Sequence, residues 1–310
     1  MTASTVATDF ADLIATARAS DGEQRACSVG GALYHYARAQ LLATEVLLTV
    51  GGAQRHAAIH ETRKALRRCR AIVALSANSS SNPAYETLDR RLSRLARSLS
   101  ALRDAEVVAL GAKAEMERSV DAAERRRWSA LHDGLTQRRD AIEREALHAD
   151  PHFSRRRESV RGLLQSLSEI DWPLLGQTPL VQALERSAVR LSRAELKARL
   201  NNTVANRHRW RRRARLLRMQ WQGLADMVKH ASLSDAVRNR IRRALHKVEG
   251  TIPAPAALAA EVDRLGAGQD ARLLQSVVQR EARSHARTRP AGESRAAPAP
   301  PGRRSERTPA

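Results

Sequence analysis

The sequence predicts an all-α protein built from two helical bundles of similar size. Strong helix formers such as Ala, Leu, Arg and Glu are frequent, whereas aromatic residues make up only 3% of the chain. From Cys27 onward, apolar residues recur at helical spacing and no alternating strand pattern occurs. An unusual basic segment also occurs once in each half, which indicates a duplicated unit.

In the first half, we expect a flexible N-terminal segment over residues 1–26, with one short helix at Phe10–Arg18, followed by a bundle over about 27–150. Its predicted helices cover about 29–49, 54–77, 83–100 with a continuation to about 118, and 119–148. Gly51-Gly52 and the run Ser79–Pro83 separate the first three. Asn82 can cap a helix that has Pro83 at its first position.

Proline-containing segments mark the boundary between the two bundles. Asp150-Pro151 and the stretch 171–179 bracket one further helix. The second bundle is expected over about 178–286, with helices at about 179–199, 203–230, 234–249, 255–265 and 269–286. Residues 287–310 are rich in Pro, Ala, Arg and Ser and predict a disordered basic tail.

The charge balance indicates a polyanionic partner. The chain has 54 Lys and Arg residues against 33 Asp and Glu residues, a formal net charge of +21. Self-repulsion at that level opposes compaction, so binding of a polyanion is expected.

One predicted helix of the first half divides cleanly into an apolar and a basic face. With a turn of 100° per residue, six cationic or titratable side chains fall within one arc of about 160°. They are His60, Arg63, Lys64, Arg67, Arg68 and Arg70. The opposite arc carries Ile59, Leu66 and Cys69, which predicts that this side packs into the bundle.

A helix of the second half repeats this arrangement. Its basic residues stand three, four, seven and ten positions after a histidine, as they do after His60. They are His208, Arg211, Arg212, Arg215 and Arg218. Such a row can be an ordinary solvated face, but solvated faces usually mix charges of both signs. Two rows of positive charge at matching offsets predict that a linear anion lies along them, because the repulsion between neighbouring cations is otherwise uncompensated.

The residue types suit phosphate. The guanidinium of Arg can bond two phosphate oxygens at once, Lys adds a point charge, and His donates one or two N–H groups. The next predicted helix carries Arg94, Arg97 and Arg103. These residues could extend the basic row or could be surface cations with local acid partners. The carboxylate of Asp104 could fix the side chains of clustered arginines.

These residues resemble the signature of CHAD domains, the conserved-histidine α-helical domains. The similarity lies in His60-x-x-Arg63-Lys64-x-x-Arg67-Arg68-x-Arg70, in the segment from Leu95 to the pair Arg103-Asp104 and Val107, and in the second copy from His208. It spans roughly residues 27–265. In the second copy Leu216 replaces a cation, and the Arg-Asp pair has no clear counterpart. The second half is therefore expected to bind more weakly or with altered geometry.

The resemblance implies two pseudo-symmetric antiparallel four-helix bundles with a basic groove between them. It also implies binding of inorganic polyphosphate by the His, Arg and Lys residues of both repeats. It also implies association with polyphosphate-containing granules in bacteria. We expect no enzyme activity, no cofactor and no metal, because Cys27 and Cys69 match no ligand spacing and His132-Asp133 stands alone. The longest apolar run, Ala39–Val50, is short and contains Glu45, so no membrane span is expected. The two cysteines fit no disulfide framework, so a reducing cytoplasm is the expected location.

Two alternative functions stay open. The first is nonspecific nucleic-acid binding, which also exploits neutralisation of phosphates. Proteins that bind single strands interleave aromatic residues with cations, and the two basic arcs carry none. The second alternative is an enzyme that processes phosphoanhydrides, which needs a metal-holding carboxylate cluster or an activated nucleophile near the basic rows. Glu61 and Asp104 alone are too few for such a cluster.

Overall fold

The computed structural model describes residues 28–78, 82–172, 177–229 and 233–288, and within these ranges the fold is all-α, as predicted. The α-helices are α2 (Val29–Leu47), α3 (Arg55–Ala77), α4 (Ala84–Ser98), α5 (Ser100–Arg118), α6 (Ala122–Ala149), α7 (Ser154–Ser168), α8 (Gln177–Leu200), α9 (Val204–Lys229), α10 (Asp235–Val248) and α11 (Pro255–Thr288). Short 3-10 turns, η1 (Gly52–Gln54) and η2 (Pro151–Phe153), precede α3 and α7. The helix predicted at Phe10–Arg18 lies outside the described residues.

Local sequence signals account for several helix starts. Side chains of Ser28, Asp121 and Ser234 accept hydrogen bonds from the first turns of α2, α6 and α10. The Oδ1 atom of Asn82 accepts from the backbone N–H of Ala84 at 2.9 Å, in agreement with its expected capping role. Gly52 has a φ of 62°, a conformation that favours glycine at the turn into α3.

Two helix boundaries differ from those expected. The predicted continuation from 83 to 118 breaks at Leu99, whose φ of −100° and ψ of 5° separate α4 from α5. Leu99 is fully buried, so packing of its side chain accompanies the break. The helices expected at 255–265 and 269–286 are instead one continuous helix, α11. Packing of α11 against α9 and α5 offsets the weak helix propensity of its glycines.

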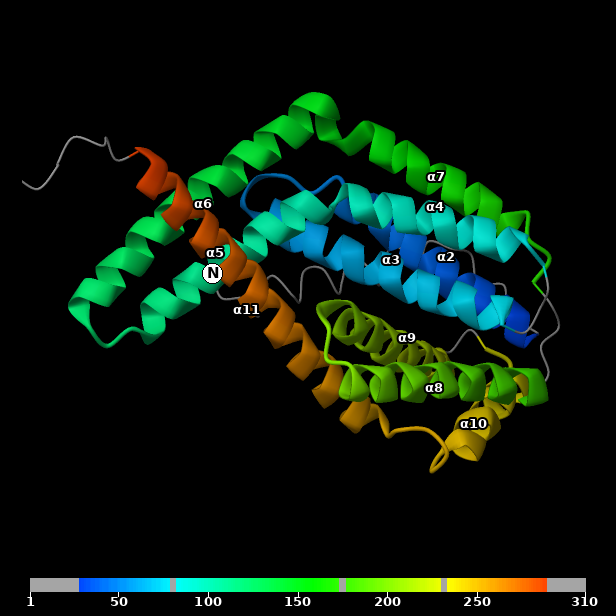
Figure 1. Ribbon diagram of the computed structural model, residues 1–310. Helices are drawn as coiled ribbons and strands as arrows, with labels where there is room; N and C mark the ends of the chain where they lie inside the picture. The colour runs from blue at the N-terminus through cyan, green and yellow to red at the C-terminus, as the bar shows by residue number, and fades with distance from the viewer. Residues whose placement is uncertain (1–27, 79–81, 173–176, 230–232, 289–310) are drawn as a thin grey trace, which may run out of the picture.

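The two halves of the chain share one hydrophobic core. In the first half, α2 packs on α3 and α7, and α3 packs on α4; in the second half, α9 packs on α8, α10 and α11. Helix α3 also packs against α9 and α8, which joins the halves at the centre of the molecule (Figure 1). Buried apolar residues continue through this junction, from Val29 on α2 to Val262 on α11. In the described ranges the first half contains α2–α7 and the second half α8–α11. The division into two pseudo-symmetric four-helix bundles stays a prediction.

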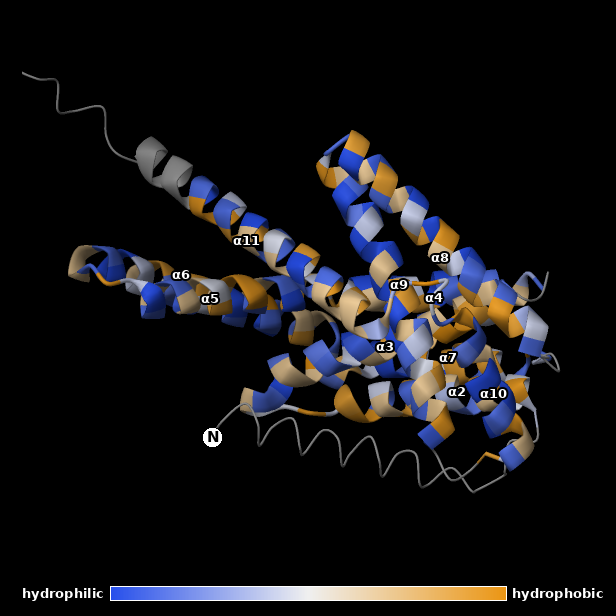
Figure 2. Cartoon of the chain, turned by 90° about the horizontal axis from the view of Figure 1, so that it is seen from below, coloured by the Kyte–Doolittle hydropathy of each residue, from blue (hydrophilic) through white to orange (hydrophobic). Residues whose placement is uncertain are grey.

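The α5–α6 hairpin projects from this shared core together with α11. Both extend on the same side of the molecule (Figure 2), and α11 crosses the hairpin in Figure 1. A second, smaller core forms where they meet, including Val108, Leu135 and Leu274. This packing holds α11 beside both α5 and α9. In the described ranges, no helix combines the length and apolar character needed to cross a membrane.

Candidate anion-binding surface

The packing of α3 against α9 brings the two predicted basic rows together. We call Arg67 on α3 and Arg215 on α9 the central pair, since they occupy matching positions of the two rows and the charge of Arg215 lowers the pKa of Arg67. The Nε of Arg67 donates to the backbone carbonyl of Arg63 at 3.0 Å. Within the described ranges, neither guanidinium of the central pair makes an ion pair with a carboxylate.

The environment of the central pair disfavours its charge. Burial lowers the pKa of Arg67 to about 9, and the nearby charge of Arg215 is the next cause. Burial likewise lowers the pKa of Arg215 to about 10, with Arg211 as the next cause. Both groups are therefore cations that have lost water and face other cations. A bound anion would offset both the loss of water and the repulsion between these cations.

Neutral acceptors position the next arginine of each row. Arg63 donates to the backbone carbonyl of Ala96 and to Oγ of Ser100, the latter at 3.0 Å. Arg211 donates to Oε1 of Gln269 on α11. Burial lowers the pKa of both guanidiniums, which nearby carboxylates oppose only in part. These two arginines are thus fixed in place while their charge stays available.

Arg103 at the start of α5 lies at the centre of the basic surface. Its charge lowers the pKa of five residues drawn from both rows: His60, Arg63, Arg67, Arg211 and Arg215. It pairs with Asp104 at 3.0 Å and with Asp270 on α11 at 3.1 Å. The first pair agrees with the expected role of Asp104. The sequence placed Arg103 only as a possible extension, although the Arg-Asp pair was a signal for it.

Helix α11 supplies further residues that the sequence did not single out. Besides Gln269 and Asp270, Asp263 pairs with Arg218 at 3.2 Å. Gly266 packs so closely against α9 that a Cβ atom there would lie 2.8 Å from Nη2 of Arg211. No motif spacing signals these contacts, because tertiary packing joins positions 45 and 58 residues apart in the contacts with α9, and 167 apart in the contact between Asp270 and Arg103.

The two histidines lie at the corresponding ends of the rows, one on each helix. Burial lowers the pKa of His60; Lys64, Arg67 and Arg103 lower it further, while Glu61 opposes them. Burial also lowers the pKa of His208, followed by the charge of Arg272, and a hydrogen bond with Gln269 opposes the shift. Both rings are therefore largely neutral at pH 7 in the free protein.

The remaining candidates differ in their surroundings. Lys64 pairs with Glu61 at 2.8 Å, and Arg70 forms a two-point contact with Asp89 on α4 at 2.7 and 3.0 Å. Arg68 and Arg212 make no ion pair within the described part of the chain. Arg97 is exposed on α4.

Arg94 lies apart from the two rows. It lines a pocket of about 520 Å³ between α4 and α7, together with Asp150 and Arg155. None of the residues lining that pocket belongs to α9 or α11. The structure therefore brings Arg94 together with α7 rather than with the central pair.

Among the described residues, no group of three or more His, Cys, Asp or Glu side chains is arranged to hold a metal ion. Cys69 is fully buried on α3, as expected for a core residue, and burial raises the pKa of its thiol to about 12. His132 lies 3.1 Å from the backbone carbonyl of Ala109, which accounts for one of its ring nitrogens.

Comparison with known proteins identifies the fold. The chain is similar to the crystal structure of the CHAD domain from the plant Ricinus communis, with a TM-score of 0.53 and 20% sequence identity. The match covers 84% of this chain and 82% of that chain. No curated protein matches the sequence. The sequence model of the CHAD domain matches residues 32–279, well over half of the chain, and the protein therefore belongs to the CHAD domain family.

Proposed function

We propose that this protein binds inorganic polyphosphate along the surface where α3 and α9 meet. The observation that carries the proposal is the central pair: two partly buried guanidiniums that face other cations and have no carboxylate partner among the described residues. Holding them so costs free energy in the free protein. A chain of phosphates would replace both the lost water and the missing counter-charge.

The extended shape of the basic surface supports a linear anion. Each row runs over about three helical turns, or roughly 15 Å, so one phosphate alone would leave most of its cations unused. The proposed ligands are the predicted residues of both rows together with Arg103. They are His60, Arg63, Lys64, Arg67, Arg68, Arg70, Arg103, His208, Arg211, Arg212, Arg215 and Arg218. Arg97 and Arg94 are proposed only as peripheral attractors, since Arg94 lies beside α7.

The surroundings of the aromatic residues on α9 favour polyphosphate over nucleic acid. Trp210 and Trp221 are each only 9% exposed, so they serve the core rather than a stacking surface. Arg264 further covers the ring of Trp210, with its Cζ atom 5.5 Å from the ring centroid. Base stacking is a main source of affinity for single strands, and these rings cannot supply it.

A competition experiment tests the choice of polyanion. Labelled single-stranded DNA bound to the protein is titrated with long-chain inorganic polyphosphate, and labelled polyphosphate is titrated with the same DNA. We expect polyphosphate to displace DNA at a far lower phosphate concentration than DNA needs to displace polyphosphate. The opposite order would identify the surface as a nucleic-acid site instead.

Two further measurements address the other expectations. Incubation of the protein with polyphosphate and Mg²⁺ or Mn²⁺ is expected to release no phosphate; clear turnover would make the protein a phosphoanhydride-processing enzyme.

In cells, a fluorescent fusion is expected to coincide with polyphosphate-containing granules. Uniform fluorescence in cells that contain such granules would contradict this location.

A further inference from the structure

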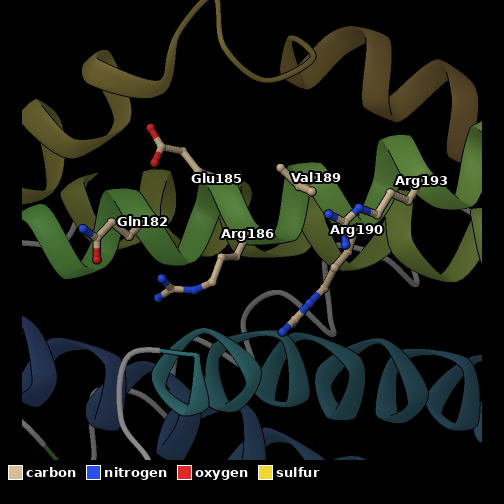
Figure 3. Close-up of a pocket in the computed structure, with 6 residues that line it drawn as sticks. All are labelled: Gln182, Glu185, Arg186, Val189, Arg190 and Arg193. Atoms are coloured by element: carbon tan, nitrogen blue, oxygen red, sulfur yellow. The ribbon is translucent and has the colours of Figure 1, made fainter.

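A second basic feature lies along α8, outside the surface where α3 and α9 meet. A groove of about 410 Å³ is lined by Gln182, Glu185, Arg186, Val189, Arg190 and Arg193. Its three arginines are spaced four and three residues apart, which places them on neighbouring turns of one helix face. Figure 3 shows Arg186 and Arg190 extending to the same side of α8, whereas Glu185 points to the opposite side.

The groove borders the C-terminal end of α3. Arg186 donates to the backbone carbonyl of Asn78 at 2.6 Å, and Arg190 donates to its Oδ1 atom at 2.9 Å. Asn78 directly follows the last residue of α3. The groove on α8 therefore lies beside the same helix that carries the first basic row.

The basic surface of α9 connects this groove with the central pair. At 100° per residue, the cations of α9 from His208 to Arg218 cover an arc of about 220°, in which Arg212 stands between Arg215 and the two residues Arg209 and Arg213. Burial lowers the pKa of Arg213, and the next causes are the charges of Arg190, Arg212 and Arg209. No carboxylate contributes to that shift. Arg213 is thus close to the groove on one side and to the central surface on the other.

We propose that a second anion track, formed by Arg190, Arg193, Arg209 and Arg213, leads from the central pair around α9 to the groove on α8. It would hold the phosphates of a long polyphosphate chain that extend beyond the surface between α3 and α9. This inference rests on the proposed function, because the same chain must first occupy the central pair.

A structural role explains only part of this track. Arg186 and Arg190 satisfy oxygen atoms at the end of α3, where cations are favoured by the helix dipole. In contrast, Arg193, Arg209 and Arg213 form no ion pair or side-chain hydrogen bond with any described residue. These three residues are therefore the ones to replace, since their loss removes charge without removing a known contact.

The test compares polyphosphate chains of two lengths. Affinities of a short oligophosphate and of long-chain inorganic polyphosphate are measured for the wild type, for R193Q/R209Q/R213Q, and for a control, R126Q/R127Q/R144Q. The control removes three exposed arginines of α6 and so changes the net charge equally. Melting curves of all three proteins monitor folding.

We expect the track variant to bind the short chain as the wild type does and to bind the long chain at least about tenfold more weakly. Loss of three phosphate contacts should also lower the slope of log affinity against log salt by about 2 for the long chain. The control should keep both affinities and both slopes close to those of the wild type.

Several outcomes would overturn the track. Unchanged binding of the long chain, an equal loss with the control, or an equal loss for both chain lengths would each remove it while leaving polyphosphate binding in place. A greater loss for long single-stranded DNA than for polyphosphate would assign the groove to nucleic acid. Failure of the wild type to bind either polyphosphate would instead refute the proposed function.

Discussion

At the residue scale, Arg67 and Arg215 are held at a cost in free energy, which the proposed anion would offset. Guanidiniums usually pair with carboxylates when they lose water. In the described part of the chain, the charges that shift the pKa values of this pair are all cations. The alkyl stem of an arginine can cover apolar surface even where its charge is unfavourable. Charge and stem should therefore have opposite effects on stability.

Removing the charge while keeping the stem should stabilise the free protein. We predict that R67M/R215M melts at a higher temperature than the wild type, by roughly 2–4 °C for each kcal/mol of relieved repulsion and desolvation. Differential scanning calorimetry without added anion measures this. The matched control R126M/R144M, which removes two exposed arginines of α6, should shift the melting temperature less. A large decrease for R67M/R215M would mean that the pair is structural.

We predict that His60 and His208 make the affinity for polyphosphate dependent on pH. Their pKa values in the free protein lie below the ordinary 6.5, whereas a bound anion favours the protonated rings and raises them. Affinity for polyphosphate should therefore rise as pH falls, by up to about tenfold per pH unit for each histidine, and should continue to rise below 6.5. Titrations at several pH values check this, and H60Q/H208Q should show a flatter profile. An unchanged profile in that variant would exclude the histidines.

The same shifts affect stability with the opposite sign. Because the folded pKa lies below the unfolded value, the unfolded chain binds more protons as pH falls below 6.5. The histidine contribution to the free energy of unfolding is therefore constant above that range and decreases on acidification through it.

At the element scale, α11 controls the second row through close packing. Gly266 lies against Arg211, and Gln269 accepts a hydrogen bond from the same guanidinium. None of this could be predicted from the sequence, where Gly266 and Gly268 looked like an interruption between two helices. The local pattern did predict the basic faces of α3 and α9, because their periodicity lies within a few turns of one helix.

Two glycine variants separate helix stability from the position of Arg211. G266A should raise stability by about 0.5–1 kcal/mol, because alanine favours a helix interior, yet its Cβ would force the Arg211 guanidinium to move. We expect a higher melting temperature together with a several-fold loss of polyphosphate affinity.

G268A is the control for this effect. Its Cβ would meet only Nη2 of Arg272, at an ordinary 3.6 Å, so stability should rise while affinity stays unchanged. Equal affinities for both variants would show that the position of Arg211 does not matter.

At the scale of the whole molecule, the fold turns two local patterns into one surface. The sequence predicted an all-α chain and the apolar side of the first basic helix, including Cys69, which is buried. It could not predict that Asp270 would reach Arg103, because 167 positions separate them and only the docking of α11 on α5 joins them. Nor could the sequence show that Arg94 lies away from the two basic rows, because the direction of a side chain on its helix does not reveal which neighbouring helix packs there.

Calorimetric titration of R67M/R215M with long-chain inorganic polyphosphate, beside the wild type and R126M/R144M, tests the convergence of the two rows most directly. Loss of two charge-assisted contacts of about 1.5–3 kcal/mol each predicts an affinity at least about a hundredfold below that of the wild type. The control should bind nearly as well as the wild type. Wild-type affinity in R67M/R215M would contradict the account, because the anion would then bind without the pair on which the site depends.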